Sequence, residues 1–396
     1  MSIKSRAMDL VVVVALIAVI SGVAHFVITN PLGPSRLLYI LQSPFIERTT
    51  RCTENAPEWM SDLQSYATRN IGAPASQLAY ITSQGNLHHC ETGWKDGILG
   101  DLPVEPSSRF RFASSTKTVT AIAILDLVNQ NKLSLDTSIV DLLALPGPFK
   151  DPRIKDITIR HLLSHKAGWD RKLAQDVMFM RNVKPWCPYK PEQLMQTSLM
   201  YEPGQTTAYS NLGYCLLGLA IEAVENMPYR DFMAQRYEFD QSTLEFVTGP
   251  YQADEVGYDF RFEEFYTRDY YQHFDFEAVA SSAGLSGSAS DLAAIVKTSL
   301  SGSGTTVLDG PVEPGCDVAI IQNCYGYGVY RYQPDAAIPP IYIHDGKFPG
   351  AVSAMFITEN KDVVVWLGAG GRKHGDSVLP DFYQQARDSL LSIGLQ

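Results

Sequence analysis

A Ser-x-x-Lys pair, Ser114 and Lys117, stands directly before a mostly apolar run from Val119 to Val128. Residues three apart lie on one face of a helix, so the two side chains can meet within about one helical turn. A serine hydroxyl is a poor nucleophile at neutral pH, and a neighbouring amine that is removed from water has a lowered pKa and can accept its proton. The pair therefore has the make-up of a nucleophile and its base.

On its own the pair is weak evidence, because roughly one chance Ser-x-x-Lys match is expected in a chain of this length. An N-terminal cap followed by a surface lysine is the competing interpretation. The stretch Ala121 to Leu125 is apolar all round, which indicates a buried helix. A lysine at the head of a buried helix needs a partner. The start of such a helix also favours the negative charge that develops during acyl transfer.

Two later blocks extend the pattern. Tyr209 and Asn211 precede an apolar helix that includes residues 215–220, and His344-Asp345-Gly346 lies on a late strand. With the Ser114 block they resemble the three motifs of the penicillin-recognising serine hydrolases, which include class C β-lactamases, D-alanyl-D-alanine carboxypeptidases and related esterases. Five segments in the family's order are far more specific than any one alone.

The other two segments are 161–168, which resembles the family's "LLSHTSG", and 284–292, which resembles its "GGL-S-DLA". The resemblance covers roughly Pro57 to the C-terminus. Lys166 and Ala167 depart from the first of these two segments.

The resemblance implies roles for the residues that match. Ser114 would be the acyl-forming nucleophile, Lys117 its activating neighbour and Tyr209 the proton relay. A phenol has a pKa near 10 in water, so Tyr209 would serve as a base only if Lys117 and another cation stabilise the phenolate.

The same resemblance implies the residues that hold the substrate. Asn211 would bind the amide carbonyl of the substrate, and His344 would occupy the place of the lysine in a Lys-Thr-Gly block. Gly346 would permit a close backbone approach. The N–H groups of Ser114 and Lys347 would form an oxyanion hole, whose donors can each contribute about two to three powers of ten in rate.

Asp345 is the most consequential departure from the family pattern. An acid beside His344 would weaken attraction for a substrate carboxylate if it faced the cleft, although strand alternation should point it the opposite way from His344. Recognition of a β-lactam or D-Ala carboxylate is therefore less secure than the hydrolase chemistry.

Composition favours an ordinary globular protein that acts on a small molecule or peptide. The net charge is −11, and the chain holds no Lys/Arg-rich run, which argues against nucleic acid as a partner. No cofactor or metal is expected. His161 and His165 are four apart, but the metalloprotease pattern with an intervening Glu is absent. His88 and His89 are adjacent on a strand and face opposite sides.

The N-terminus is expected to target a membrane. Residues 10–28 contain no Asp, Glu, Lys or Arg and are long enough to span a bilayer. A retained anchor is favoured over a cleaved signal peptide, for which Gly22 and Ala24 supply a possible cleavage site. Lys4 and Arg6 before the span indicate a cytoplasmic N-terminus and an exported, periplasmic or extracellular body.

Six cysteines are compatible with disulfides in an exported domain. Cys316 and Cys324 are close enough in sequence for a disulfide to close the short loop between them. Cys90 is also expected to form a disulfide. Cys215 lies within an apolar run and is predicted to be a buried thiol.

The pattern of elements predicts an α+β fold with a mainly antiparallel sheet, flanked by helices, that both ends of the chain build. The hydrolase domain would span residues 53–396 with a mostly helical insertion at about 135–280, after an anchor or signal segment (1–30) and a linker (31–52). Within the insertion, 258–277 is interpreted as a solvated flap with some aromatic side chains tucked inward.

The function expected from the sequence is a membrane-anchored serine hydrolase that cleaves an amide, ester or β-lactam through an acyl-enzyme. The alternative is a penicillin-binding or sensing protein that keeps the fold without efficient turnover. The choice of substrate and the oligomeric state are not readable from the sequence.

Overall fold

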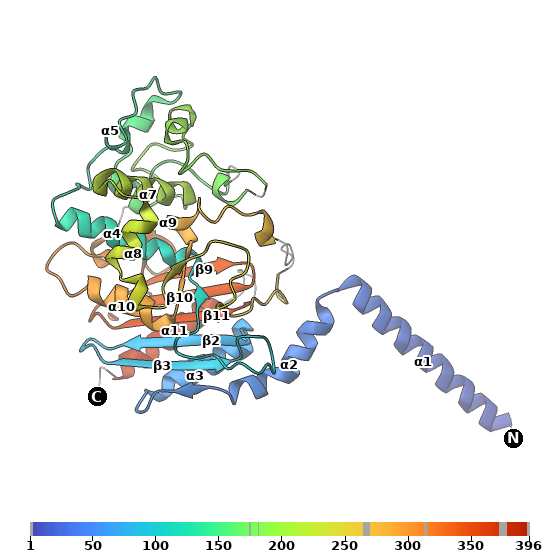
Figure 1. The fold of residues 1–396 in the computed structure, drawn as a ribbon. Helices are drawn as coiled ribbons and strands as arrows, with labels where there is room; N and C mark the ends of the chain where they lie inside the picture. The colour runs from blue at the N-terminus through green and yellow to red at the C-terminus, as the bar shows by residue number, and fades with distance from the viewer. Residues whose placement is uncertain are drawn as a thin grey trace.

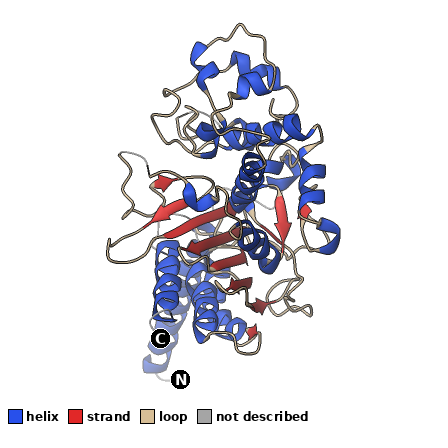
Figure 2. Cartoon of the chain, turned by 90° about the vertical axis from the view of Figure 1, so that its left-hand side faces the viewer, coloured by secondary structure: helices blue, strands red, loops and turns tan. Residues whose placement is uncertain are grey.

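The structure is a computed structural model, and it describes residues 3–173, 176–180, 182–263, 270–312, 315–371 and 378–393. One antiparallel sheet lies in the middle of the body, and helices lie on both sides of it (Figures 1 and 2). This architecture confirms the predicted α+β fold class.

The α-helices are α1 (Ile3–Thr29), α2 (Gly33–Glu47), α3 (Glu58–Tyr66), α4 (Thr116–Asn129), α5 (Ile139–Leu142), α6 (Ile159–Leu163), α7 (Asn211–Glu225), α8 (Tyr229–Arg236), α9 (Ala280–Ala283), α10 (Ala289–Ser299) and α11 (Val378–Ile393). The strands are β1 (Arg51–Cys52), β2 (Ala75–Ile81), β3 (Leu87–Gly93), β4 (Phe110–Arg111), β5 (Glu245–Phe246), β6 (Leu285–Gly287), β7 (Cys324–Tyr325), β8 (Tyr330–Tyr332), β9 (Ile341–Phe348), β10 (Ala351–Thr358) and β11 (Val363–Ala369).

Both ends of the chain build the main sheet. Among the described residues, eight strands follow the order β1-β3-β2-β11-β10-β9-β8-β7, and neighbouring strands are antiparallel. Figure 1 shows the result as blue strands β2 and β3 beside red strands β9 to β11. The sequence patterns of 78–83 and 87–92 predict a hairpin, which is β2 and β3, and those of 327–332, 341–344, 351–358 and 362–367 predict late strands, which are β8 to β11. These elements are confirmed.

The two faces of the sheet lead into two hydrophobic clusters. On β11, Val363 and Val365 belong to the cluster that contains α4 and α7, whereas Val364 and Trp366 belong to the cluster that contains α3 and α11. Successive strand residues point to opposite faces, so an all-apolar strand needs cover on both sides. The fully buried Trp366 ring also donates its Nε1–H to Gln64 Oε1 at 3.2 Å.

The region around residues 135–280 contains α5 to α8, several 3-10 turns and long irregular loops. It also contributes β5, a strand that the sequence did not predict. β5 pairs with β6, which pairs with β4, and these strands form a second small sheet beside the turn that follows β4.

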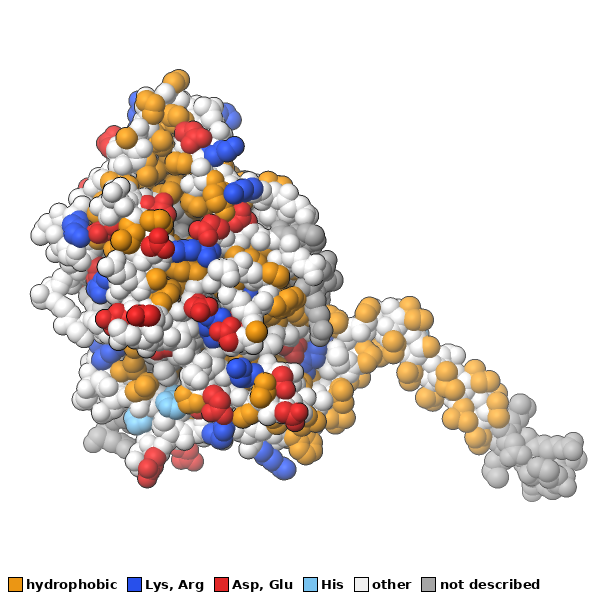
Figure 3. All heavy atoms as spheres, in the orientation of Figure 1, with side chains coloured by type: hydrophobic (Ala, Val, Ile, Leu, Met, Phe, Trp, Pro, Cys, Tyr) orange, Lys and Arg blue, Asp and Glu red, His pale blue; other side chains and the backbone are white. Residues whose placement is uncertain are grey.

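The N-terminal helix α1 projects from the body, and from Val11 onward its surface is mostly hydrophobic (Figures 1 and 3). Its segment Val11–Thr29 is long and apolar enough to cross a membrane, by length and composition, and none of it is buried in the body.

Residues 33–47, which fall in the predicted linker, form the helix α2. Its inner face buries Tyr39 and Ile46, and the Tyr39 hydroxyl donates to the Thr68 carbonyl at 2.6 Å. Pro44 has no N–H to donate within the helix, and the Ser43 hydroxyl donates to the Ile40 carbonyl at 3.2 Å instead. The two prolines in this segment suggested a linker. The packing of the inner face against the body and the Ser43 hydrogen bond, which replaces the missing backbone bond to the Ile40 carbonyl, stabilise the helix instead.

The six cysteines form the disulfides Cys52–Cys90, Cys187–Cys215 and Cys316–Cys324, and none is free. The expected disulfide of Cys90 and the predicted disulfide between Cys316 and Cys324 are confirmed. The prediction of a buried thiol at Cys215 was wrong, because its apolar surroundings bury a disulfide rather than a thiol. The partner, Cys187, comes from a loop far from α7 in the sequence, so local pattern gave no sign of it.

Replacing both Cys187 and Cys215 by Ala should lower the free energy of unfolding by about 3 to 4 kcal/mol, because a bond across 28 residues no longer constrains the unfolded chain. The same replacement at Cys316 and Cys324, which are 8 residues apart, should cost about 1 kcal/mol less. Chemical denaturation measures both. A free thiol in the unreduced, denatured wild type would contradict the pairing.

Candidate active site

Ser114 lies in a short 3-10 turn that leads directly into α4, at the N-terminal end of that helix. The preceding residue, Ala113, has a φ of +48°, in the left-handed region that costs an L-residue roughly 1 to 2 kcal/mol. The Ser115 hydroxyl contacts the Ser353 hydroxyl at 2.8 Å, and Ser353 donates to the Phe112 carbonyl at 2.7 Å. These bonds fasten the turn to β10 and fix the backbone that presents Ser114.

Lys117 is fully buried beside Ser114. Its Nζ donates to Ser114 Oγ at 3.1 Å and to the Ser282 carbonyl at 2.7 Å. Burial lowers the pKa of Lys117 well below its usual value, and the positive charge of Arg171 lowers it further. The site therefore favours the neutral amine, which is the form that can accept the proton of Ser114.

Tyr209 lines the same cavity as Ser114, and its hydroxyl interacts with the Ser114 hydroxyl closely enough to lower the pKa of Tyr209. Two basic groups lie over its ring: Lys117 Nζ is 4.9 Å and Arg171 Cζ is 4.3 Å from the ring centroid. Burial nevertheless raises the pKa of Tyr209 above its usual value, while the Ser114 hydroxyl and Arg171 act in the opposite direction. The phenol is therefore protonated at rest, and Lys117 is the better base.

His165 positions Tyr209 without contacting Ser114. Its ring centroid lies 4.2 Å from that of Tyr209. The Ala208 N–H donates to the His165 carbonyl at 2.8 Å, and the Ser210 N–H donates to His165 Nδ1 at 3.3 Å. Burial, followed by the charge of Lys117, lowers the pKa of His165 well below its usual value, so the neutral ring can accept this bond.

Sequence reasoning missed this role for His165. It treated the residue as half of a possible metal pair with His161, which instead completes the N-terminal cap of α6 with Thr158. The usable signal was the place of His165 in the segment that resembles "LLSHTSG", one of the five matched segments.

Asn211 begins α7 and lines the same cavity as Tyr209. Its Nδ2 donates to Asp176 Oδ2 at 2.6 Å, and its buried Oδ1 accepts no hydrogen bond from the described residues. The amide N–H that the family resemblance assigns to a substrate carbonyl is therefore engaged by a carboxylate. A substrate that uses Asn211 must share or displace that bond.

Strand β9 brings its backbone against the turn that carries Ser114. A Cβ atom added at Gly346 would lie 2.4 Å from the Phe112 carbonyl oxygen and 2.7 Å from the Ser114 nitrogen. No side chain fits at such distances without a shift of the backbone. Gly346 therefore sets the distance between β9 and the turn.

The register of the β9–β10 hairpin shows where the Lys347 N–H points. Phe348 pairs with Ala351 across the two-residue turn Pro349-Gly350, and the closing pair of such a turn is hydrogen-bonded. Ladder bonds alternate along an antiparallel pair, so the N–H of Lys347 points away from β10, toward the edge near Ser114. It can therefore meet a substrate oxygen together with the Ser114 N–H.

The placement of His344 and Asp345 corrects the sequence expectation. The His344 ring is buried, contacts the Tyr325 hydroxyl at 3.3 Å through Nε2, and is not part of the cavity lining. Burial and the charge of Lys117 lower the pKa of His344 to about 3, so the ring is neutral. Asp345, expected to point away, lines the cavity, and Gln322 donates a hydrogen bond to its carboxylate.

The structure therefore brings most of the predicted site residues around one cavity of about 950 Å³. Its lining includes both the predicted groups and charged neighbours: Ser114, Tyr209, Asn211, Lys347, Arg171, Lys172, Asp176 and Asp345. Lys117 lies behind Ser114, Gly346 contributes its backbone, and His344 lies outside the lining. The mixture of cations and carboxylates gives the cavity no dominant sign of charge.

The segment interpreted as a solvated flap holds the β9–β10 hairpin. Glu263 accepts a hydrogen bond from the Gly350 N–H at 3.2 Å and contacts Lys347 Nζ at 3.4 Å. The buried Tyr271 hydroxyl donates to the Pro349 carbonyl at 2.5 Å. The guanidinium of Arg111 lies 4.7 Å from the Tyr271 ring centroid. The described part of the segment is thus largely structural, and it fixes the hairpin that carries the Lys347 N–H.

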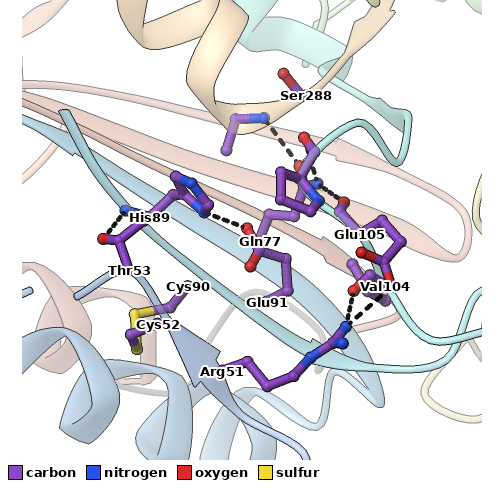
Figure 4. Close-up of polar contacts among 12 residues, drawn as sticks. Arg51, Cys52, Thr53, Gln77, His89, Cys90, Glu91, Val104, Glu105 and Ser288 are labelled. Carbon is purple, nitrogen blue, oxygen red and sulfur yellow. Dashed lines mark hydrogen bonds and ion pairs between the residues drawn. A yellow bond between two sulfur atoms is a disulfide. The ribbon is translucent and has the colours of Figure 1, made fainter.

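The histidines considered as metal ligands have other contacts. On β3, His89 Nδ1 contacts Glu91 Oε1 at 2.8 Å, while the next residue, Cys90, points to the other face and bonds Cys52 (Figure 4). Within the described residues, no group of three or more His, Cys, Asp and Glu side chains is placed to hold a metal ion.

Sequence comparison finds one family and several relatives. A family model described as "Beta-lactamase" matches residues 78–372. Two proteins of Dichelobacter nodosus, described as putative and probable fimbrial assembly protein FimD, are each 36% identical over 373 residues, or 94% of either chain. Penicillin-binding protein 4* of Bacillus subtilis is 31% identical over 164 residues, which cover 37% of this chain and 32% of that protein.

Comparison with solved structures gives the same fold. D-amino acid amidase from Ochrobactrum anthropi SV3 superposes with a TM-score of 0.66 at 18% identity, over 85% of this chain and 97% of that chain. A penicillin-binding protein from Bacillus halodurans superposes with a TM-score of 0.62 at 23% identity, over 81% of this chain and 99% of that chain.

Two charge-neutralising variants should shift the pH dependence of Ser114 reactivity in opposite directions. Arg171→Gln removes a positive charge that lowers the pKa of Lys117, so the pKa of Lys117 should rise. The acid limb of the pH–rate profile, where Lys117 is still protonated, should therefore move to higher pH. Asp345→Asn removes a negative charge that raises the pKa of both Lys117 and Tyr209, so the limb should move to lower pH. The rate at which a fluorophosphonate labels Ser114, followed against pH, measures the shift.

Lys172→Gln is the matched control, because Lys172 lines the same cavity but is not among the causes of either pKa shift. Its profile should match the wild type, whereas the two test variants should differ from it several-fold in rate on the acid side. Shifts of the same sign in both test variants would contradict the electrostatic account.

Proposed function

The chain belongs to the β-lactamase family, as its sequence blocks predicted, and on that basis we propose that it is a serine hydrolase that forms an acyl-enzyme on Ser114. The observation that carries the proposal is the 3.1 Å contact between Ser114 Oγ and the buried Nζ of Lys117, an amine whose pKa is lowered. A purely structural lysine would not need to be buried beside a reactive hydroxyl.

In the proposed acylation, Ser114 Oγ attacks the carbonyl carbon and its proton passes to the neutral Nζ of Lys117. The oxyanion that forms lies between the N–H groups of Ser114 and Lys347. Tyr209 then gives its phenolic proton to the leaving group and takes one from Lys117. This order of transfers follows from the raised pKa of Tyr209 and the lowered pKa of Lys117. Water releases the acyl group and regenerates the Ser114 hydroxyl.

The proposed substrates are small amides, esters, β-lactams or peptides. The solved relatives include a D-amino acid amidase and penicillin-binding proteins, and an amide substrate agrees with both. Asp345 on the cavity wall opposes a substrate carboxylate, and its place there favours substrates that are neutral at that end.

We also propose that α1 is a retained anchor and that the body lies on the exported side of the membrane. The apolar span Val11–Thr29 supports the anchor. Three disulfides support an oxidising compartment. Because two relatives are named for fimbrial assembly, we propose that the natural acyl substrate belongs to the assembly of a surface fibre.

A second candidate is a penicillin-binding or sensing protein that is acylated but turns over slowly. The engagement of Asn211 by Asp176 favours it, since a substrate must disturb that bond before it can use the amide. Asp176→Ala should then raise the acylation rate of a poor hydrolase even on the high-pH plateau of the rate profile, where the negative charge of Asp176, which also raises the pKa of Lys117, no longer limits the rate. An efficient hydrolase should be unchanged or slower on that plateau.

Ser114→Ala should abolish covalent labelling and hydrolysis of a chromogenic ester, a chromogenic β-lactam, a D-amino acid amide and a D-Ala-D-Ala peptide. Ser301→Ala is the control, because Ser301 is exposed, its hydroxyl donates only to the Lys297 carbonyl among the described residues, and it does not line the cavity, so the activity should stay intact. Lys117→Ala should reduce acylation by about two to four powers of ten, the usual contribution of a general base. Intact-mass spectrometry and initial rates measure these effects.

Equal activity in wild type and Ser114→Ala would remove Ser114 from its role. A wild type that is labelled but never released favours the sensing protein. In the cell, Ser114→Ala and its serine-to-alanine control separate catalysis from a scaffolding role. Loss of surface fibres with Ser114→Ala but not with the control links the hydrolase activity to fibre assembly.

A further inference from the structure

Helix α2 has two apolar faces, and the body covers only one of them. Tyr39, Ser43 and Ile46 are buried against the body. The opposite face carries large apolar side chains that are 53% to 69% exposed: Leu37, Leu38, Ile40, Leu41 and Phe45. An exposed apolar group of this size on a folded domain marks an interaction surface.

The exposed side chains form a continuous stripe. Leu37, Leu41 and Phe45 follow at four-residue spacing and therefore lie one above another along the helix. Arg48 comes one turn later in the same stripe, and its guanidinium lies 5.7 Å from the Phe45 ring centroid. An apolar stripe that ends in an exposed cation matches the boundary between acyl chains and phosphate groups in a bilayer.

The joint between α1 and α2 places this stripe near a membrane. The candidate span ends at Thr29 and α2 begins at Gly33. The Asn30 N–H donates to the Phe26 carbonyl at 2.8 Å, and the Gly33 N–H donates to the Asn30 carbonyl at 2.8 Å, so the joint is ordered. Three connecting residues reach at most about 11 Å, and the headgroup layer on each side of the hydrocarbon core is roughly 5 to 8 Å deep, so α2 begins within that layer or just outside it. Figure 3 shows hydrophobic side chains along both α1 and α2.

We propose that the outer face of α2 lies in the headgroup and acyl boundary of the same bilayer that α1 crosses, and holds the body against the membrane. The inference rests on the anchor in the proposed function and goes beyond it, because a span alone would leave the body free to turn. Continuity with the span identifies the lipid surface as the occupant of this face, because any other partner would have to fit against the membrane itself.

Contacts on the inner face make α2 part of the body. The Tyr39 hydroxyl is bonded to Thr68, and Arg36 Nε donates to the Arg261 carbonyl at 2.7 Å. Arg261 lies two residues before Glu263, which holds the β9–β10 hairpin. The active-site cavity is therefore held at a fixed position relative to α2, and the protein would take its substrate at a set height above the bilayer.

Site-directed fluorescence in the full-length protein tests the proposal. A single cysteine labelled with bimane replaces Leu41 on the outer face, or Leu87 as the control. Leu87 is 45% exposed and begins β3. It lies at the far end of β3 from Gly93, whose N–H donates to Thr49, just after α2. The protein is placed in nanodiscs of phosphatidylcholine and phosphatidylglycerol.

The Leu41 label should be quenched several-fold more by shallow nitroxide lipids than the Leu87 label, and several-fold less by aqueous iodide. Equal access of iodide to both labels would overturn the proposal. Shielding from iodide without quenching by lipid would also overturn it, because a second copy or another protein would then cover α2. Unchanged disulfide pairing and fluorophosphonate labelling of Ser114 establish that each labelled protein is folded.

A third label at Ile17, within the span, separates this proposal from the anchor. Quenching of that label by deep nitroxide lipids reports that α1 crosses the bilayer. If deep nitroxide lipids do not quench the Ile17 label but shallow ones still quench the Leu41 label, the anchor is rejected and the interfacial helix is kept. If deep lipids quench the Ile17 label but shallow ones do not quench the Leu41 label, the anchor is kept and the interfacial helix is rejected.

Discussion

The burial of the Lys117 amine beside Ser114 is the constraint on which the rest of the site depends. A buried ammonium ion is costly, so the surroundings favour the neutral amine, and a neutral amine is a base. Burial acts in the opposite sense on Tyr209 and keeps its phenol protonated. The same low-polarity surroundings thus set one base and one acid on either side of a single hydroxyl group.

The fold maintains this arrangement through elements that are far apart in the sequence. The turn of Ser114 is bonded to β10 through Ser353, and the loop of Tyr209 is bonded to His165. The end of β9 that carries the Lys347 N–H is held by the segment that contains Glu263 and Tyr271. The Ser114 turn, the Tyr209 loop and the Lys347 N–H are each held in place by a second residue, which is the arrangement that precise chemistry requires.

The strands, the nucleophile block and the family were predictable because their signals are local or ordered along the chain. Runs of apolar residues marked β9 to β11, and the spacing of Ser114 and Lys117 placed them on one helical turn. The bond of Cys215 to Cys187, the bond of Asn211 to Asp176 and the helix α2 were not predictable, since each depends on packing between distant segments.

His344 and Asp345 show the limit of family resemblance. The resemblance located β9 correctly, but it could not say that Tyr325 would bury the imidazole or that Gln322 would hold Asp345 at the cavity. The acylation chemistry is therefore better defined than the substrate. The chemistry follows from the side chains of Ser114, Lys117 and Tyr209 and from backbone N–H groups, whereas the choice of substrate depends on cavity residues outside the shared motifs.

The most direct test of the central claim is the ionisation of Lys117 itself. Lysine labelled with ¹³C and ¹⁵N, with the Lys117 signal assigned by comparison with Lys117→Arg, reports the protonation of Nζ as the pH is varied. The account predicts a neutral amine at pH 7 and a pKa far below the usual value of about 10.4. An Nζ that stays protonated up to the usual lysine range would contradict the account, because Ser114 would then have no base beside it.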